Sequence, residues 1–485
     1  MPNVGRASAR PLQMPDQFDV VVIGGGTAGL VTASGCARLG RKVALIEREK
    51  LGGDCLWTGC VPTKALVASA KLAHQLRHAD AFGLAAQEPR VTPKAIMESM
   101  RAARRAVEPH DDPAKFRKLG IDVIDGEARL TTRSEVEVNG RRLAAKDIVI
   151  ATGSRTAVPP VEGLAEHGFL DHVTFLAQDE LPRSLLILGG GAIGIEFAQI
   201  FRRFGCEVVV VEMLDDIVNK EDRDVIDAVR RMLTEDGIEI HTGWAAKSVR
   251  AEGGKKRVRI EDKTGETREI AADEIFVASG RRGNTENLGE VKLNGSYVAA
   301  DKYLRTSVPR VWACGDVHGG LQFTHVAERE AWKLVRNMLF PGLSPMDYAN
   351  VPWAIYTDPE IAHVGMTEAE AKAAEGEANV RIYAMPMADA DRAIVDRATR
   401  GFIKLVCDRK GRILGGHLLC TNASSLIAPI VLARAKGLRV GDLANLITPY
   451  PSLADTLRGA AGQRFTEMGE GWLGGLGRRI AAWSQ

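Results

Sequence analysis

Two cysteines separated by four residues are the part of this sequence best suited to redox chemistry. Cys55 and Cys60 lie in the segment LGGDCLWTGCVPTKAL, residues 51–66, at the start of a stretch that we expect to be helical. Such a pair can close a small strained disulfide, and a helix N-terminus stabilises the thiolate formed on reduction. The alternative, a pair of buried free thiols, fits poorly with the backbone-shaping residues around them, which are Gly52, Gly53, Gly59 and Pro62.

The other cysteines do not extend this pair into a metal site. The sequence has seven cysteines, and five are scattered singly at positions 36, 206, 314, 407 and 420. This is not a disulfide framework, and a zinc site would need two ligands beyond Cys55 and Cys60. We therefore predict no metal site, and we expect His363 and His417 to be core or interface residues.

A strand–turn–helix–strand unit occurs twice and predicts two dinucleotide sites. Residues 19–47 read DVVVIGGGTAGLVTASGCARLGRKVALIE, and residues 184–212 read SLLILGGGAIGIEFAQIFRRFGCEVVVVE. In each G-x-G-x-x-G motif the first glycine allows a tight turn, the second admits a pyrophosphate, and the third lets the helix pack on the strand. The glutamate that ends each unit can accept hydrogen bonds from a ribose. These residues are Gly24, Gly26, Gly29 and Glu47, and Gly189, Gly191, Gly194 and Glu212.

Glu212 also indicates which nicotinamide is used. A carboxylate at this place repels a 2′-phosphate, and no arginine follows in residues 213–218. The sequence therefore favours NADH over NADPH. Arg202 and Arg203 lie on the preceding helix, and we expect both side chains to be solvated.

Composition places the chain among ordinary multidomain enzymes. A length of 485 residues predicts two to four domains, and a formal charge of +2 shows no footprint of nucleic-acid binding. Residues 1–17 lack the apolar core of a signal peptide, and the uncharged run 20–37 is interrupted by glycines. We expect a disordered lead-in, no membrane span and a cytoplasmic protein.

Several motifs together resemble the class I pyridine nucleotide–disulfide oxidoreductases. Residues 52–64 match the signature G-G-x-C-x-x-x-x-C-x-P-x-K, and the similarity extends over about residues 18–465. The other matching motifs are Ala151-Thr152-Gly153, Ala278-Ser279-Gly280-Arg281 with Asn284, and Ala313-Cys314-Gly315-Asp316. The resemblance implies an α/β protein with two Rossmann-like domains and a C-terminal α+β dimerisation domain.

The resemblance also implies domain limits and a homodimer. FAD would bind residues 18–154 and 280–347, and the nicotinamide domain would span residues 155–279. An interface domain would occupy residues 348–470, followed by a tail, residues 471–485, that we expect to pack on the body or to be disordered. Cys314, His318 and His325 fall in the segment that would contact the flavin, which is a better interpretation than a metal site.

Individual roles follow from the same resemblance. Cys60 would be the charge-transfer thiol against the flavin, and Cys55 would be the interchange thiol that faces substrate. Lys64 would lie near flavin N5 and pair with Glu196, and Asp316 would hold the ribityl chain. Further cofactor contacts would come from Gly53, Thr152, Gly153 and Gly280.

The C-terminal active-site motif departs from the family pattern. Relatives that act on glutathione or lipoamide have H-P-x-x-x-E there, whereas Tyr450 and Asp455 occupy the two positions here, and the last histidine of the chain is His417. A phenol with a pKa near about 10 is a poor base at neutral pH. Tyrosine at this place is similar to mercuric reductase, although the chain shows neither the terminal cysteine pair nor the N-terminal metal-binding module of that enzyme.

Three functions remain open from the sequence. The first is an NADH-dependent reductase that passes electrons through FAD and Cys55–Cys60 to a metal ion, a quinone or a reactive electrophile. The second is oxidation of a lipoyl-type dithiol by NAD, with Tyr450 and Asp455 as proton relay. The third is a non-enzymatic, redox-sensing flavoprotein.

Overall fold

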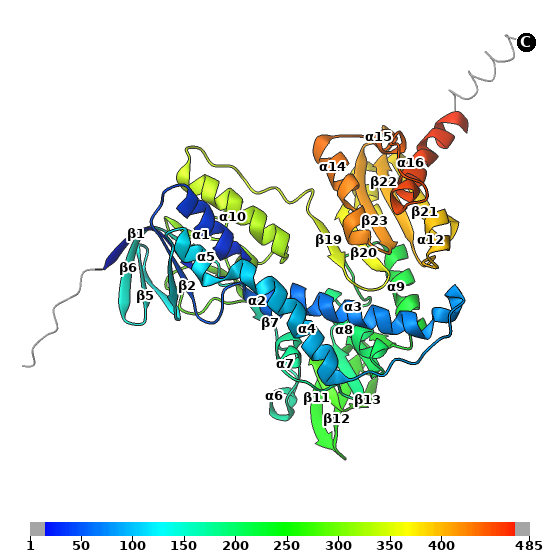
Figure 1. Ribbon diagram of the computed structural model, residues 1–485, viewed down its shortest axis with the longest axis horizontal. Coiled ribbons are helices and arrows are strands. Elements are labelled where there is room, and N and C mark those ends of the chain that lie inside the picture. The colour runs from blue at the N-terminus through cyan, green and yellow to red at the C-terminus, as the bar shows by residue number, and fades with distance from the viewer. Residues whose placement is uncertain (1–14, 471–485) are drawn as a thin grey trace, which may run out of the picture. The chain divides into compact units, whose positions relative to one another are not determined.

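The computed structural model describes residues 15–470, which form two compact units (Figure 1). The first unit contains the residues up to 61 together with 104–155 and 281–346. The second contains 62–103, 156–280 and the residues from 347 onward. The segment 62–103, which the resemblance places within an FAD domain, thus has its closest packing partners in the second unit.

The first unit is built on a seven-stranded sheet with the order β3-β2-β1-β6-β5-β4, and β18 also pairs with β6. Strands β1, β2, β3, β6 and β18 are parallel, whereas β4, β5 and β6 form an antiparallel meander. Helix α1 (Thr27–Arg38) lies beside α10 (Thr324–Leu339) on this sheet. The strands are β1 (Asp16–Ile23), β2 (Val43–Glu47), β3 (Asp122–Asp125), β4 (Ala128–Thr132), β5 (Glu135–Val138), β6 (Arg141–Ile150) and β18 (Val311–Ala313).

The second repeat forms a parallel sheet in the second unit, with the order β10-β9-β8-β14. Its central strand reads SLLIL and is buried along its whole length, as expected for a parallel strand covered on both faces. An antiparallel sheet β11-β12-β13 is attached to it. The elements are β8 (Ser184–Leu188), α8 (Ala192–Arg203), β9 (Glu207–Glu212), α9 (Arg223–Glu235), β10 (Glu239–Thr242), β11 (Trp244–Glu252), β12 (Lys255–Asp262), β13 (Thr267–Ala272) and β14 (Glu274–Val277).

The C-terminal part of the second unit is a five-stranded antiparallel sheet with the order β19-β20-β23-β22-β21. Its apolar residues form a separate core with the helices that follow, among them α14 (Ala428–Lys436) and α16 (Leu453–Glu470). The strands are β19 (Pro352–Ile355), β20 (Glu360–Gly365), β21 (Val380–Pro386), β22 (Phe402–Asp408) and β23 (Ile413–Cys420). The predicted α/β class with an α+β domain at the C-terminal end is confirmed.

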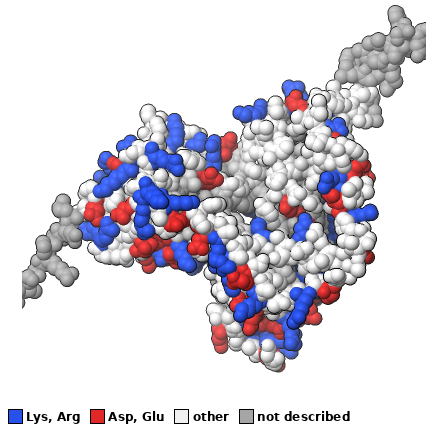
Figure 2. Space-filling view, in the orientation of Figure 1, with Lys and Arg blue, Asp and Glu red and all other residues white. Residues whose placement is uncertain are grey.

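The structure also bears on the predicted lead-in, tail and absence of a membrane span. Strand β1 begins at Asp16, so the last two residues of the expected lead-in are already part of the sheet. The expected tail, residues 471–485, lies outside the described residues. Within residues 15–470 no helix is both long and apolar enough to span a membrane. On the face shown in Figure 2, basic and acidic side chains are interspersed.

Candidate active site and cofactor sites

The first glycine of each motif occupies a turn that no other residue fits. Gly24 and Gly189 have φ of +107° and +115°, in the range that favours glycine. A Cβ atom would lie 2.3 Å from the Ala151 carbonyl oxygen at Gly24 and 2.4 Å from the Ala278 carbonyl oxygen at Gly189. The two turns are therefore built in the same way, each against the end of a neighbouring parallel segment.

The other two glycines differ in what surrounds them. A Cβ on Gly29 would lie 1.8 Å from the Gly24 carbonyl oxygen, so the helix packs too closely on the turn for any side chain. Around Gly191, in contrast, a Cβ would meet no atom within 4 Å, and at Gly26 it would meet only the Gly53 Cα at 3.8 Å. The backbone is thus open at the start of α1 and of α8. This space fits the pyrophosphate of FAD in the first unit and that of the nicotinamide dinucleotide in the second.

Both terminal glutamates hold their turn in place. Glu47 accepts hydrogen bonds from the N–H of Gly25 at 2.6 Å and of Glu49 at 2.8 Å. Glu212 accepts from the N–H of Gly190 at 2.6 Å and of Leu214 at 2.8 Å. Each carboxylate thus ends its strand beside the glycine turn, the position from which it can accept a ribose hydroxyl.

The residues around Asp316 form a connected polar group in the first unit. Asp316 accepts a hydrogen bond from the Ser154 hydroxyl at 2.7 Å, and Arg281 donates to the same hydroxyl at 2.8 Å and to Asp54 at 2.6 Å. Burial raises the pKa of Asp316, an effect that Arg281 and the hydrogen bond from Ser154 oppose. The group has the hydroxyl-binding character that the family resemblance assigns to Asp316.

The A-T-G segment, residues 151–153, is hydrogen-bonded to the segment that contains Asn284. Thr152 donates from its hydroxyl to the Asn284 carbonyl at 2.6 Å, and the Asn284 amide donates to the Thr152 carbonyl at 2.8 Å. The remaining predicted cofactor glycines, Gly53, Gly153 and Gly280, all have positive φ, of +56°, +71° and +120°. Their backbone turns require glycine, and their cofactor contacts stay a prediction.

The two thiols lie in direct contact at the junction of two helices. Cys55 is in α2 (Gly53–Trp57), and Cys60 is the first residue of α3 (Cys60–Arg77). The Cys60 Sγ is 3.3 Å from the Thr324 hydroxyl at the start of α10. A hydrogen bond to Cys60, together with burial, raises the pKa of the Cys55 thiol. Cys55 and Thr324 therefore both lie beside the Cys60 sulfur at the start of α3, where a thiolate would be stabilised.

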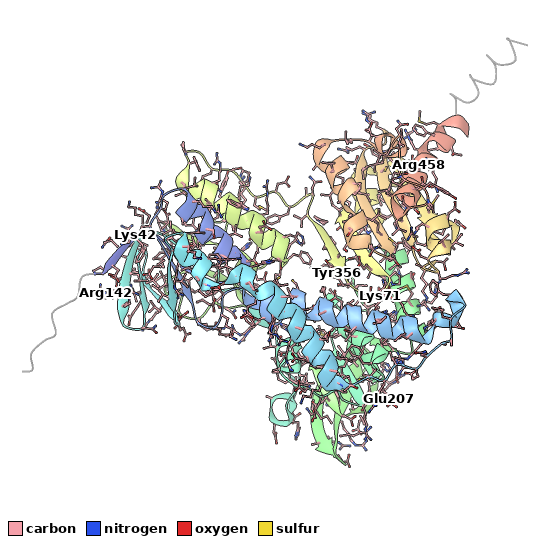
Figure 3. The ribbon with its side chains drawn as sticks, in the orientation of Figure 1. Lys42, Lys71, Arg142, Glu207, Tyr356 and Arg458 are labelled. Carbon is pink, nitrogen blue, oxygen red and sulfur yellow. The ribbon has the colours of Figure 1, made fainter. Side chains whose placement is uncertain are left out.

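Lys64 and Glu196 form the predicted ion pair in the second unit. Lys64 Nζ lies 2.9 Å from Glu196 Oε2, and the Glu196 side chain is 8% exposed. The other carboxylate oxygen accepts the Tyr356 N–H at 2.7 Å, and Lys64 Nζ lies 4.5 Å from the centre of the Tyr356 ring. Tyr356, labelled in Figure 3, follows β19 and contributes to this group, which the sequence analysis did not foresee.

Tyr450 and Asp455 do not form a pair with each other. The Tyr450 hydroxyl donates to Asp391 at 2.8 Å, which raises the pKa of the phenol, and the side chain is 73% exposed. Asp455 accepts from Thr448 at 3.0 Å and from Arg458 at 2.8 Å, and the bond from Arg458 lowers the pKa of the carboxyl. Within one chain, Tyr450 and Asp455 therefore belong to two separate hydrogen-bonded groups.

Arg203 differs from its prediction, and Glu330 is a further buried group that was not predicted. The prediction that Arg203 is solvated is wrong, because its side chain is 4% exposed and lies 3.0 Å from Asp358. Glu330, on α10, accepts hydrogen bonds from the Gly315 N–H at 2.7 Å and from His318 at 2.9 Å. Glu330 and Thr324 belong to no recognisable sequence motif. Only folding brings α10 to the cysteines and to the turn at Gly315 and Asp316.

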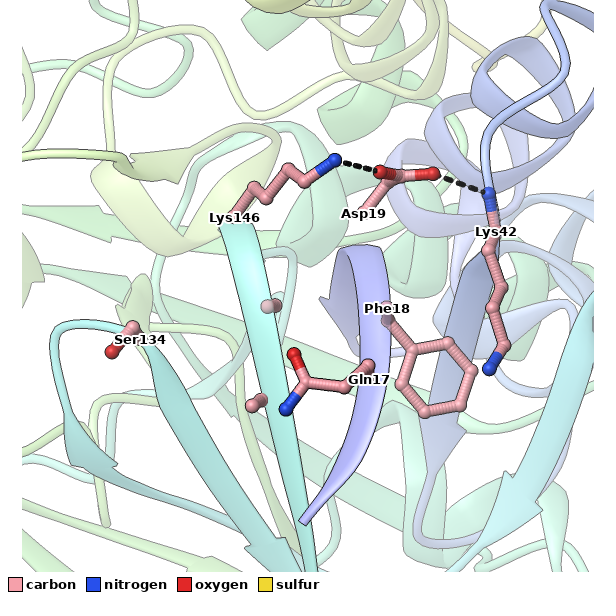
Figure 4. Close-up of a pocket in the computed structure, with 8 residues that line it drawn as sticks. Gln17, Phe18, Asp19, Lys42, Ser134 and Lys146 are labelled. Atoms are coloured by element: carbon pink, nitrogen blue, oxygen red, sulfur yellow. Dashed lines mark hydrogen bonds and ion pairs between the residues drawn. The ribbon is translucent and has the colours of Figure 1, made fainter.

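One pocket lies away from these groups (Figure 4). It lies beside the first residues of β1 and the middle of β6, where Asp19 accepts from Lys146 at 2.7 Å and from the Lys42 N–H at 2.9 Å. Ligands of open parallel sheets bind outside the carboxyl ends of the strands, where the glycine turns are. We therefore assign no cofactor to this pocket.

Comparisons with known proteins agree with the site geometry. Residues 18–331 match the pyridine nucleotide-disulphide oxidoreductase family, and residues 351–461 match the dimerisation domain of the same family. Dihydrolipoyl dehydrogenase from Rhizobium etli is 34% identical over 476 residues, 92% of this chain and 98% of that protein. Mercuric reductase from Bacillus cereus is 33% identical over 454 residues, 91% of this chain and 70% of that protein.

A solved structure shows the same architecture. The HOCl-induced flavoprotein disulfide reductase RclA from Escherichia coli superposes with a TM-score of 0.82 at 30% identity, covering 92% of this chain and 99% of that chain. A Cu(II) complex of that protein matches equally well, with a TM-score of 0.82. The relatives are enzymes that contain FAD and use NAD(P)H, so the interpretation as a non-enzymatic flavoprotein is not retained. The chain belongs to the pyridine nucleotide-disulphide oxidoreductase family, and it is a flavoprotein disulfide oxidoreductase with a dimerisation domain.

Proposed function

We propose that this enzyme uses NADH to reduce a small acceptor that needs little proton transfer from the protein, such as a soft metal ion, a quinone or a reactive electrophile. The observation that carries this proposal is the state of Tyr450, whose hydroxyl donates to Asp391 and not to Asp455. A phenol with a raised pKa is a weak general base at neutral pH. An acceptor whose reduction depends on such a base would therefore be served poorly.

The cysteine pair supplies the reducing chemistry. Bound in the first unit, FAD would supply the two-electron relay between NADH and the cysteine pair. The Cys55–Cys60 disulfide takes up two electrons and one proton as its S–S bond breaks, which leaves Cys60 as a thiolate beside Thr324 at the start of α3 and Cys55 as a thiol. The acceptor then takes the two electrons as the S–S bond forms again and the proton of Cys55 is released to water.

Lys64 and Glu196 have a supporting electrostatic role in the proposal. Glu196 is almost fully buried and holds the Lys64 ammonium at 2.9 Å, while the ring of Tyr356 lies against the same charge. A fixed positive charge stabilises negative charge that develops on a bound flavin, and it does so most strongly where water is excluded. Glu196 orients Lys64 and is a positioning residue.

The dimer and the cell compartment belong to the same proposal. The dimerisation domain supports a homodimer, in which Tyr450 would approach the partner's Cys55. The FAD domain at residues 18–154 and 280–347, the nicotinamide domain at 155–279 and a cytoplasmic location stay predictions.

An acceptor screen tests the proposal. NADH oxidation is followed with Hg²⁺, Cu²⁺, quinones, oxidised lipoamide and oxidised glutathione, for the wild type and for the matched variants Tyr450→Phe and Tyr450→His. We expect turnover with a metal ion, quinone or electrophile that Tyr450→His does not improve. Fast turnover with oxidised lipoamide alone would overturn the assignment of the acceptor class.

Lipoyl dithiol oxidation is the second candidate, because dihydrolipoyl dehydrogenase is 34% identical over nearly its whole length. If the missing base limits this reaction, the double variant Tyr450→His, Asp455→Glu should oxidise dihydrolipoamide faster than the wild type. General acid–base catalysis is typically worth about 10²–10⁴-fold, so the gain would be easy to measure. Fast dihydrolipoamide oxidation by the wild type would make this candidate the first.

A further inference from the structure

A buried group of one carboxylate and two imidazoles lies within the second unit. Glu221 is in the connection between β9 and α9, and His363 and His417 are directly opposite each other on the neighbouring strands β20 and β23. The side chains of all three are at most 1% exposed. The group therefore joins the connection that follows Glu212 to the antiparallel C-terminal sheet.

One atom of each side chain points toward a common centre. Glu221 Oε2 lies 3.1 Å from His363 Nδ1 and 3.9 Å from His417 Nδ1. One ligand atom from each residue lies within 4.8 Å of the other two. Two imidazoles and one carboxylate are a donor set that proteins use for zinc, at metal–ligand distances of about 2.0–2.2 Å.

The other polar atom of each side chain, which faces away from the centre, already has a partner. Trp353 Nε1 donates to Glu221 Oε1 at 2.6 Å, and His363 Nε2 lies 3.0 Å from the Gly365 carbonyl oxygen. His417 Nε2 is hydrogen-bonded to the Met366 carbonyl oxygen at 3.3 Å and also lies 3.0 Å from Asp222 Oδ2. Metal-binding histidines characteristically donate their second N–H to a carboxylate or a backbone carbonyl, which directs the other nitrogen to the metal.

His417 Nδ1 is the atom that this arrangement leaves without a partner. It is fully buried and has no hydrogen-bond partner among the described residues. A buried polar atom of this kind costs about 1–3 kcal/mol unless a further group satisfies it. The atom lies 3.9 Å from Glu221 Oε2, so a cation between the two would satisfy both.

The net charge of the groups around the centre also favours a bound cation. Two carboxylates, Glu221 and Asp222, are buried there with a single ammonium, that of Lys404, which lies 3.0 Å from Asp222. Lys404 is shared with two partly exposed carboxylates, Asp224 at 2.7 Å and Glu368 at 3.3 Å. With neutral histidines the buried set therefore has an excess of negative charge, which burial makes costly.

We infer that Glu221 Oε2, His363 Nδ1 and His417 Nδ1 bind a divalent transition-metal cation of the Zn²⁺ class, which clamps the β9–α9 connection to the C-terminal sheet. Metal uptake displaces the protons shared between these groups. The inferred site is independent of the proposed acceptor and differs from the expectation of no metal.

Metal analysis of the FAD-loaded, tag-free enzyme tests the inference. The parent protein carries Cys55→Ser and Cys60→Ser, so that the redox thiols cannot contribute ligands, and is incubated with ZnCl₂ and desalted. We expect about one zinc per chain by elemental analysis, as for a structural site. Glu221→Gln and His417→Gln should each lower the content at least tenfold. His172→Gln, at another buried histidine that is 6% exposed, should leave it unchanged.

Cobalt substitution gives a second reading that does not depend on variants. CoCl₂ in place of ZnCl₂ should give the visible absorption bands of a low-coordinate nitrogen and oxygen site. Parent protein that retains no zinc or cobalt would overturn the inference and leave the histidines as protonated partners of Glu221. Equal zinc content in the parent and in His417→Gln would overturn it as well. If the variants lose their FAD, the cobalt spectrum of the parent protein alone tests whether the site binds metal.

Discussion

Cys55 and Cys60 have different environments although only four residues separate them. Cys60 begins an 18-residue helix and lies 3.3 Å from the Thr324 hydroxyl, whereas Cys55 lies in the short helix before it. A hydrogen bond to Cys60, together with burial, raises the pKa of Cys55. The charge-transfer role of Cys60 and the interchange role of Cys55 stay predictions, and this difference in surroundings supports them.

The two serine variants should separate these roles by absorption. Anaerobic two-electron reduction of the wild type should give a long-wavelength band from a thiolate beside the flavin. Cys60→Ser should abolish the band, and Cys55→Ser should show it without reduction, because the Cys60 thiolate is then permanently free. A band that is lost in Cys55→Ser and kept in Cys60→Ser would reverse the two roles.

Glu212 should decide the choice of nicotinamide. Its carboxylate ends β9 beside the second glycine turn, where a 2′-phosphate would add a second negative charge. Steady-state kcat/KM should favour NADH over NADPH by at least tenfold, which corresponds to about 1.4 kcal/mol. Glu212→Gln combined with Leu214→Arg should narrow or reverse this ratio, whereas Glu207→Gln, an exposed position on the same strand (Figure 3), should not change it. A wild type that prefers NADPH tenfold would contradict the assignment.

At the scale of elements, helix α10 connects Cys60 with the turn at Gly315 and Asp316. Thr324 at its first turn reaches Cys60, and Glu330 accepts from the Gly315 N–H and from His318. Glu330 is 1% exposed, so these two donors help to stabilise its buried charge. The same helix therefore supports both the thiolate and the turn that presents Asp316.

The His318–Glu330 pair should make stability depend on pH. Burial alone would lower the pKa of His318, but the hydrogen bond to Glu330 raises it above the ordinary value of 6.5. A raised pKa in the folded state stabilises the protein fully below about pH 6.5, and this contribution is lost as the pH rises through the folded-state pKa. From pH 6 to 9 the Tm of the wild type should fall more than that of His318→Gln, at equal FAD content. A pH dependence identical in both proteins would exclude this contribution.

At the scale of the molecule, the C-terminal domain exposes apolar side chains that a second copy of the chain would cover. Ile447 is 100% exposed and Tyr450 is 73% exposed, although both lie in the part of the chain that matches the family's dimerisation domain. Clustered exposed apolar residues mark protein interfaces. They support the proposed homodimer, and we expect Tyr450 to lie in its interface.

An aspartate at this surface should therefore weaken the dimer. Ile447→Asp should shift the protein from dimer toward monomer in sedimentation velocity experiments at micromolar concentration, because it would bury a charge. Leu293→Asp, at an exposed leucine of the first unit, is the matched control and should stay dimeric. A wild type that sediments as a monomer would refute the homodimer, and an unaffected Ile447→Asp would place the interface elsewhere.

The sequence by itself determined the features that are encoded locally. Both glycine turns, the glutamates that close them and the cysteine pair are formed by residues close together in the chain, so their spacing predicts their geometry. The Lys64–Glu196 pair bridges 132 residues and was found only through the resemblance to a family. Arg203 was misjudged because its helix has no exposed face at that position.

Only the tertiary structure decided the contacts between distant segments. Thr324 meets Cys60 across 264 residues, and His363 meets Glu221 across 142. His363 and His417 become neighbours only through the register of β20 and β23, and neither strand signals this in its own sequence. The physical reason is that burial and sheet pairing, and not chain spacing, bring these side chains together. Cofactor binding could therefore be predicted from the sequence, whereas the buried histidine site could not.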